Sequence, residues 1–334
     1  MKSSLILATT LLAAAPNVLC NPIARAFNTT FSNATNSTTA NATQILQFAL
    51  TLEHLENAFY SQGLSNFSES DFENAGLPSS ARGRFEQIAQ HESTHVDFLT
   101  NALGNDSVAA CNYSFPSTDP NSFAALSGIL ESVGNAAYLG AAVDLTNDTT
   151  ALKAAASILS TEARHASWVY SSVLGSDPWS GAFDTPLDGD LVYTLASSFI
   201  VSCPESNPAL PFTAFPSLNV SGSGNSSFGN SSSGNSSVNS TYAPAPGNNV
   251  TLSYDNSTAG ENAQFLAFLS GLNTTFANIS SDKQVAIPNN LQGLVFAVVT
   301  TNDTSVSNGS IVAGPATLFF PFSPNSTNAN VTDM

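Results

Sequence analysis

The chain has 334 residues and a formal net charge of −17, from 7 Lys and Arg against 24 Asp and Glu. Only 9% of its residues are charged, and Asn, Ser, Thr and Gly take the place of the missing charge. An acidic chain without a basic patch cannot displace the counterions of a nucleic acid or bind an anionic lipid surface electrostatically. We therefore expect neither nucleic acid nor a membrane as a partner, and the length allows one large domain or two ordinary ones.

The first 20 residues predict a signal peptide. Lys2 precedes an apolar stretch over residues 5–15 that is too short to span a bilayer. Residues 21–43 form an Asn/Thr-rich leader, and about twenty Asn-x-Ser/Thr sequons occur along the whole chain. We expect a secreted glycoprotein that carries N-glycans and resides outside the cell or in the cell wall.

Three cysteines occur, at Cys20, Cys111 and Cys203. If cleavage removes Cys20 with the signal peptide, two cysteines remain in an oxidising compartment, which favours a disulfide between Cys111 and Cys203. A free thiol is the alternative.

Helical periodicity covers residues 44–204. Apolar residues repeat at intervals of three and four from residue 45, and further helices are predicted over residues 80–103, 119–142, 150–174 and 187–200. Asp119 followed by Pro120 is typical of a helix start. The pattern predicts a mainly α fold, a four-helix bundle with a fifth helix.

The periodicity changes after Pro204. Strand-length apolar runs occur at residues 250–254, 265–269, 294–300, 311–313 and 316–320, separated by Gly and Pro. They predict a small β-sandwich within residues 205–323. A Gly-Asn-Ser-Ser repeat marks a disordered insertion near residues 221–245, and residues 324–334 form a polar tail.

Two patterns each occur twice on the predicted helices. A glutamate lies seven residues before a tyrosine, and a Glu-x-x-His motif follows on the next helix. The residues are Glu53 with Tyr60, Glu92 with His95, Glu131 with Tyr138, and Glu162 with His165. Spacings of three and seven residues place each pair on one helix face, so a bundle can direct all six Glu and His side chains to one point.

Four inward carboxylates in an apolar bundle would repel one another and lose hydration unless cations compensate them. Four Glu and two His are the ligand set of ferritin-like di-iron and di-manganese carboxylate bundles. We therefore predict two Fe or Mn ions held by Glu53, Glu92, His95, Glu131, Glu162 and His165, with Glu92 and Glu162 bridging both ions.

Four further residues are predicted to contact these ligands rather than the metal. Tyr60 and Tyr138 can donate hydrogen bonds to ligand carboxylates. Glu56 follows Glu53 by one turn and could replace it as a ligand, but the matching position after Glu131 is Gly134. His91 precedes His95 by one turn.

The sequences around these ligands resemble a known family. Residues 50–60 (LTLEHLENAFY), 91–96 (HESTHV) and 136–141 (AAYLGA) are similar to exported ferritin-like proteins of fungi described as desiccation-related, stress-response and late sexual development proteins. The resemblance covers residues 44–204 and is weaker beyond. It implies a ferritin-like bundle and a role in stress or development, without implying a reaction.

Other functions remain open from the sequence. His91-Glu92-x-x-His95 also matches the zinc metalloprotease motif, but Phe98 and Asn101 stand where the metzincin extension needs Gly and His. The main hypothesis is a di-metal protein that reacts with O₂, peroxide or Fe(II). The alternative is a non-enzymatic glycoprotein of the cell wall or spore surface.

Overall fold

The computed structural model describes residues 40–222, 246–255, 263–322 and 324–325. The predicted signal peptide, nearly all of the leader, the Gly-Asn-Ser-Ser repeat and nearly all of the polar tail lie outside the described residues.

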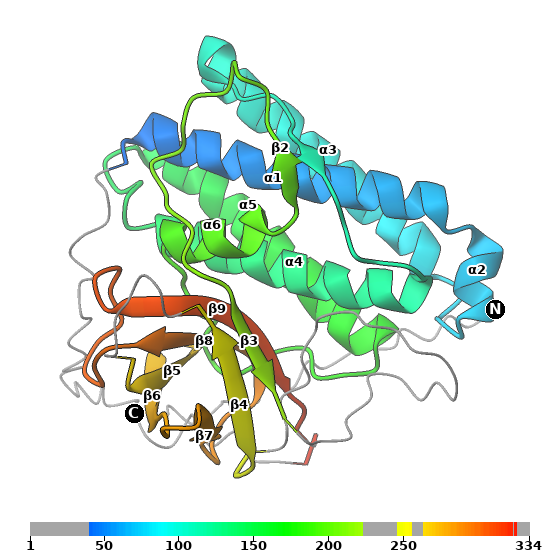
Figure 1. Cartoon of the computed structure of the whole chain (residues 1–334). Helices are drawn as coiled ribbons and strands as arrows, with labels where there is room; N and C mark the ends of the chain where they lie inside the picture. The colour runs from blue at the N-terminus through cyan, green and yellow to red at the C-terminus, as the bar shows by residue number, and fades with distance from the viewer. Residues whose placement is uncertain (1–39, 223–245, 256–262, 323, 326–334) are drawn as a thin grey trace, which may run out of the picture. The chain divides into compact units, whose positions relative to one another are not determined.

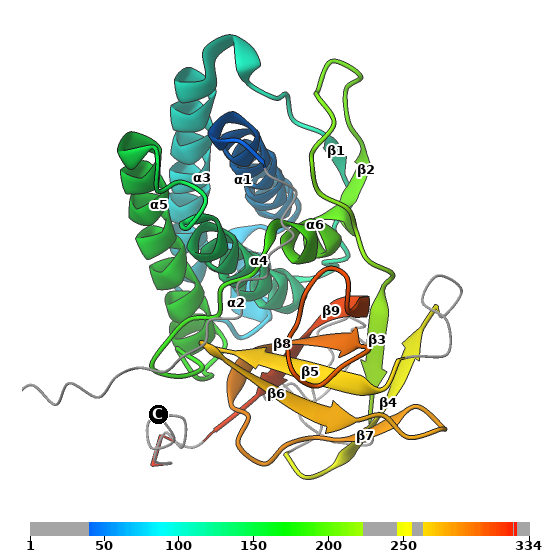
Figure 2. The same cartoon turned by 90° about the vertical axis from the view of Figure 1, so that its left-hand side faces the viewer.

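Four long helices lie alongside one another and form the bundle (Figures 1 and 2). They are α1 (Ala42–Asn66), α3 (Ala81–Leu103), α4 (Pro120–Ala141) and α5 (Thr149–Trp168). Capping boxes at Asn41 and Asp119 satisfy the first backbone N–H groups of α1 and α4, and Asp148 caps α5. Buried Phe59, Phe85 and Phe123 pack within the bundle core.

The shorter helical segments depart from the sequence prediction. The helix expected to run to residue 174 ends at Trp168 and continues as a π-helical turn, Val169–Val173. The helix predicted over residues 187–200 is shorter in the structure, where α6 (Gly189–Ser197) begins after the capping residue Asp188. Helix α2 (Glu69–Asn74) and a 3₁₀ turn (Gly104–Asp106) were not expected. Among the described residues, none of the helices combines the length and apolar character needed to cross a membrane.

Three antiparallel sheets accompany the helices. A short pair joins β1 (Asn112–Tyr113) to β2 (Ile200–Ser202). A three-stranded sheet has the order β3-β4-β7, from β3 (Leu218–Ser221), β4 (Asn249–Tyr254) and β7 (Gln284–Ala286). A four-stranded sheet has the order β6-β5-β8-β9, from β5 (Phe265–Ser270), β6 (Asn273–Asn278), β8 (Gly293–Thr300) and β9 (Ile311–Phe320).

The expected small β-structure is present, but it also contains β3, β6 and β7, which were not expected, and its last strand differs from the prediction. The predicted strands at 311–313 and 316–320 are a single strand, β9, which continues through Gly314 and Pro315. A shift in the β8–β9 register lies beside this point, between Ala297 and Val299. The sequence signal was misread because Gly and Pro usually end a strand, whereas an irregular register tolerates them within one.

The two central strands of the four-stranded sheet, β5 and β8, are buried on both faces. Leu266 and Phe268 of β5 pack into a core shared with the three-stranded sheet, whereas Ala267 and Leu269 belong to the core of the helices. Because side chains alternate along a strand, a strand with a core on each side is apolar at every position. This explains the unbroken apolar run of residues 294–299.

Hydrogen bonds also join the helical and β-rich parts. Asn308 donates to Asp190 of α6, and Gly271 N–H donates to Thr185 Oγ1 over 2.7 Å. The described residues all lie in one compact unit. The boundary proposed between residues 204 and 205 stays a prediction.

Cys111 and Cys203 face each other at the ends of the β1–β2 pair, and the structure joins them as a disulfide. The pairing of Asn112 with Ser202 brings the two cysteine Cα atoms to 4.2 Å, well within the separation of about 7 Å beyond which a bridge cannot form.

Candidate metal centre

All six Glu and His residues singled out in the sequence meet inside the four-helix bundle. Helix α1 supplies Glu53 and α4 supplies Glu131, while α3 and α5 supply the two Glu-x-x-His pairs. The side chains form two groups, and within each group the ligand atoms lie within 4.8 Å of one another: Glu53, Glu92, His95 and Glu162; and Glu92, Glu131, Glu162 and His165. Glu92 and Glu162 belong to both groups.

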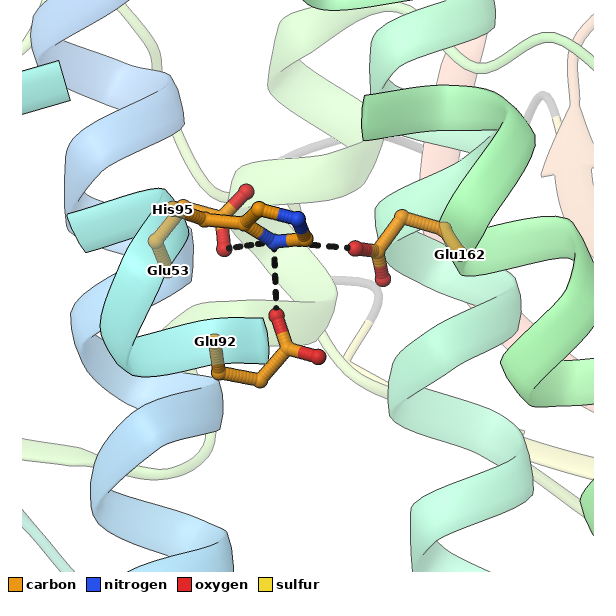
Figure 3. Close-up of side chains that lie close together, drawn as sticks. All are labelled: Glu53, Glu92, His95 and Glu162. Atoms are coloured by element: carbon orange, nitrogen blue, oxygen red, sulfur yellow. Dashed lines mark hydrogen bonds and ion pairs between the residues drawn. The ribbon is translucent and has the colours of Figure 1, made fainter. Parts of the chain in front are cut away.

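His95 lies at the centre of the first group (Figure 3). Its Nδ1 atom is 2.9 Å from Glu92 Oε2, 3.2 Å from Glu53 Oε2 and 3.4 Å from Glu162 Oε1. One ring nitrogen thus points to three carboxylates from three helices, which places the donor atoms around a common point.

The second group repeats this arrangement around His165. Its Nδ1 atom lies 2.9 Å from Glu131 Oε2 and 3.3 Å from Glu92 Oε1. In both Glu-x-x-His pairs it is therefore Nδ1 that faces the carboxylates, as the i, i+3 spacing on a helix allows.

Each of the two tyrosines donates a hydrogen bond to the glutamate, Glu53 or Glu131, of the other helix. Tyr138 of α4 donates to Glu53 Oε1 of α1 over 2.5 Å, and Tyr60 of α1 donates to Glu131 Oε1 of α4. Seven residues rise about 10.5 Å along a helix, too far for a tyrosine to reach the glutamate of its own helix. Because α1 and α4 run antiparallel, each tyrosine lies beside the glutamate of the other helix.

Sequence reasoning missed one participant, Ser127 of α4. Its Oγ lies 2.7 Å from the Tyr60 hydroxyl, and since Tyr60 donates to Glu131, the serine donates to Tyr60. Ser127 precedes Glu131 by one turn, so its position on the ligand face was visible in the sequence. Serine is too common on helices to attract notice by spacing alone.

Burial and proximity shift the pKa values of the site. Glu53, Glu92, Glu131 and Glu162 are fully inaccessible to solvent. Burial raises the pKa of Glu53 to about 7 and that of Glu162 well above its ordinary value, and neighbouring carboxylates add to both shifts. Burial alone would raise the pKa of Glu92, but hydrogen bonds from His165 and His95 lower it to about 2.

The histidines shift in the opposite sense. Burial alone would lower the pKa of His95, but its hydrogen bonds with Glu53 and Glu92 and their charges raise it to about 10. The pKa of His165 rises to about 9, because Glu131 and Glu92 outweigh burial in the same way. Without a bound cation, protons on the histidines and on some of the carboxylates balance the charge of the cluster.

The residues present fit a metal. Both oxygens of Glu162 are buried and accept no hydrogen bond from the described residues, although Oε1 makes the ion-pair contact with His95. Leaving a buried carboxylate oxygen unpaired is costly, and a cation would satisfy it. Carboxylate oxygens combined with imidazole nitrogens are donors that suit Fe or Mn.

Glu56 is a fifth carboxylate at the site, and it stands outside both ligand groups. It is 4% exposed, and burial followed by the charges of Glu53, Glu131 and Glu92 raises its pKa well above the ordinary value. A Cβ atom at Gly134 would lie 2.9 Å from Glu56 Oε1 and 3.1 Å from Glu162 Oε2. The missing side chain of Gly134 therefore makes room for both carboxylates.

His91 also lies outside the two ligand groups. Its ring stacks on that of His165 at a centroid distance of 5.1 Å, and its Nδ1 atom is 2.9 Å from His165 Nε2. His91 thus contacts the nitrogen of His165 that faces away from the carboxylates. This position does not pair His91 with His95 as the zinc protease motif requires.

The comparisons with known proteins agree with this geometry. Residues 41–174 match the ferritin-like domain family. Over 263 residues the chain is 27% identical to Protein rds1 of Schizosaccharomyces pombe (strain 972), an alignment that covers 71% of this chain and 65% of that relative. The chain thus spans about two thirds of the relative's length. The ferritin-like fold expected from the sequence is confirmed, and the match to the ferritin-like domain lies over residues 41–174.

Proposed function

We propose that the chain is a secreted di-metal carboxylate protein that binds two Fe or Mn ions. One observation carries the proposal: Glu92 and Glu162 each belong to both ligand groups, and each also faces the histidine of the other Glu-x-x-His pair, Glu92 Oε1 facing His165 and Glu162 Oε1 facing His95. Glu53 and His95 would complete one ion's ligands, and Glu131 and His165 would complete the other's. Four carboxylates neutralise two divalent ions, so the filled site carries no net charge.

When bound, the two ions would supply the exchange of electrons with O₂, peroxide or Fe(II). The protein contributes positioning and exclusion of water. The Tyr138 and Tyr60 hydroxyls fix the orientation of Glu53 and Glu131, since each donates to the carboxylate oxygen that does not face a histidine. At His165, Nε2–H can donate to His91 Nδ1 while Nδ1 serves as the ligand.

The biological setting is a further part of the proposal. The apparent signal peptide and the many sequons favour an extracellular or cell-wall glycoprotein. Similarity to a fungal relative, together with the family resemblance noted above, favours a role in stress or development. The sequon-dense composition equally favours the alternative, a non-enzymatic surface glycoprotein whose metal serves stability.

Metal analysis of the purified full chain tests the proposal. We expect close to two Fe or Mn per chain, and close to none in the double variant Glu92→Ala with Glu162→Ala, because these carboxylates serve both ions. Glu86→Ala, at an exposed position on α3, is the matched control and should keep both ions. A single Zn per chain, with proteolysis lost in Glu92→Ala, would instead establish the metalloprotease.

Turnover separates the enzymatic function from the structural one. The metal-loaded chain should consume Fe(II) or peroxide faster than the Glu92→Ala, Glu162→Ala variant supplied with the same metal. If the loaded chain is inert but unfolds at a higher temperature than the metal-free chain, the structural alternative holds.

A further inference from the structure

A cavity of about 470 Å³ adjoins the metal centre on the side of Glu56. Its walls come from α1, α4 and the end of α6, from β3 and β9, and from the segment around Ser114 and Pro116. Its volume lies within the range of about 300–1,000 Å³ that is typical of small-molecule sites. The cavity is thus formed jointly by the helical and β-rich parts.

Most of the cavity wall is apolar. Its lining residues include Leu130 and Val133 of α4, Phe199 after α6, and Ala316 of β9. None of the described residues that line it is Lys, Arg or His, so no side chain of the wall can form an ion pair with an anionic group. An anion in this cavity would also lie against the Glu56 carboxylate, which disfavours acids and phosphates.

Glu56 is the one ionisable group among the described lining residues. Glu56 is 4% exposed, and no hydrogen bond from the described residues reaches its carboxyl oxygens, which are not fully enclosed by protein. A buried carboxylate with no partner is expected to be satisfied by a ligand, a cation or water. Because Glu56 lines the cavity and stands outside both metal-ligand groups, a ligand in the cavity can supply that donor.

Gly134 lines the same cavity and connects it to the metal centre. A Cβ atom there would approach Glu56 Oε1 and Glu162 Oε2 to 2.9 and 3.1 Å, so both carboxylates reach the same gap in α4. A molecule that contacts Glu56 therefore lies close to Glu162, a predicted bridging ligand, with the Glu56 carboxyl group between them.

We propose that this cavity binds a neutral, mainly apolar molecule whose hydroxyl group donates a hydrogen bond to Glu56. An apolar body matches the walls, and a neutral hydroxyl group can hydrogen-bond to the Glu56 carboxyl group without bringing a charge into the apolar cavity. Binding of a molecule in this cavity does not depend on the proposed function. Only the inference that this molecule is a substrate of the metal centre rests on the proposed function.

Three naphthalene probes of matched shape test the proposal in the full chain, with and without metal. They are 2-naphthol, 2-methylnaphthalene and 2-naphthoate, and fluorescence titration gives the dissociation constant of each. We expect 2-naphthol to bind about tenfold more tightly than 2-methylnaphthalene and 2-naphthoate, which corresponds to one buried hydrogen bond. In Glu56→Leu this preference should fall below about twofold.

A filling variant tests the location. Ala316→Trp places a large ring in the cavity from β9 and should abolish binding of all three probes, whereas Ala156→Trp, at an exposed position of α5, should leave binding unchanged. Circular dichroism and metal content identify any variant that misfolds. If Ala316→Trp misfolds, Ile129→Phe, which fills the cavity from α4, replaces it.

Undiminished 2-naphthol binding in a folded filling variant, or an unchanged preference in Glu56→Leu, would overturn the proposal. Tighter binding of 2-naphthoate than of 2-naphthol would do the same. A chain that binds 2-naphthol as expected but holds no metal would refute the metal centre and keep the cavity. Two bound metals with no probe binding would refute the cavity and keep the metal centre.

Discussion

The two halves of the metal site carry the same ligands but differ around them. Helices α1 and α3 supply Glu53, Glu92 and His95, and helices α4 and α5 supply Glu131, Glu162 and His165. Each half also supplies a tyrosine to the other. The proposed coordination of two ions would require equivalent donors on both sides, which would explain why the ligand patterns repeat.

The differences lie one turn or one residue away from the ligands. Glu56 follows Glu53 by three residues where Gly134 follows Glu131, and His91 precedes Glu92 where Thr161 precedes Glu162. The first difference is complementary, because the space left by Gly134 is where the Glu56 carboxylate fits. The second gives His165 an imidazole neighbour, whereas the Thr161 hydroxyl bonds to the backbone carbonyl of Ser157. The comparison shows that the six predicted ligands repeat in both halves, whereas the positions one turn or one residue away differ.

The largest expected effect comes from removing one terminal ligand in each half. Glu53→Ala and Glu131→Ala should each retain close to one metal ion per chain instead of two, because the bridging carboxylates and the other half stay intact. Metal content of the purified variants measures this. Loss of both ions from either single variant would show that the halves bind metal only together.

The second prediction concerns how the folding stability of the metal-free chain depends on pH in the two halves. Glu53, His95 and His165 have folded-state pKa values raised to about 7, 10 and 9, so each stabilises the fold below its ordinary pKa and loses that contribution as pH rises through the raised value. Glu92, lowered to about 2, loses its contribution as pH falls from about 4.5.

The metal-free chain should therefore be most stable near pH 5 and lose stability as the pH rises to about 10, beginning with Glu53 in the α1–α3 half. The loaded chain should lose less, since bound metal displaces these protons. Unfolding midpoints of both forms across this pH range measure the difference. A metal-free chain that becomes more stable between pH 5 and pH 9 would contradict the assignment.

Removing the tyrosine hydroxyls compares the two crosswise hydrogen bonds. Tyr60→Phe and Tyr138→Phe should each lower the free energy of unfolding by about 1–3 kcal/mol, because a buried carboxylate loses its donor. The effect of Tyr60→Phe should be the larger, since it also leaves Ser127 without its partner. Denaturant unfolding of the metal-loaded variants measures both. Equal effects would mean that Ser127 finds another partner at little cost.

The smallest expected effect concerns the neighbour of His165. His91→Ala removes the acceptor for His165 Nε2–H and should weaken metal affinity about tenfold at the ion bound by the α4–α5 half. Thr161→Ala, at the matching position, is the control and should change affinity little. Competition with a chelator of known affinity measures both variants. Comparable losses in the two variants would assign the effect to helix packing instead.

Much of the bundle and the candidate ligand set could be predicted from the sequence. Spacings of three, four and seven residues are direct consequences of helix geometry, so Glu92 with His95 and Glu162 with His165 marked themselves as pairs. The bounds of α3 and α4 followed from local signals as well, including Asp119 and Pro120. Gly314 and Pro315 led to the prediction of two strands where the structure has the single strand β9. The register of the partner strand decides whether a strand can continue through glycine and proline.

The sequence by itself determined which residues carry metal-binding chemistry, because ligand types and helical periodicity are local properties of the chain. Only the tertiary structure decided which side chains meet across helices. The antiparallel packing of α1 and α4 assigns each tyrosine to the opposite glutamate, and the gap at Gly134 gives Glu56 its place. Packing of the β-rich part against α4 and α6 created the cavity beside Glu56. These features depend on contacts between residues far apart in the chain, and no local pattern encodes them.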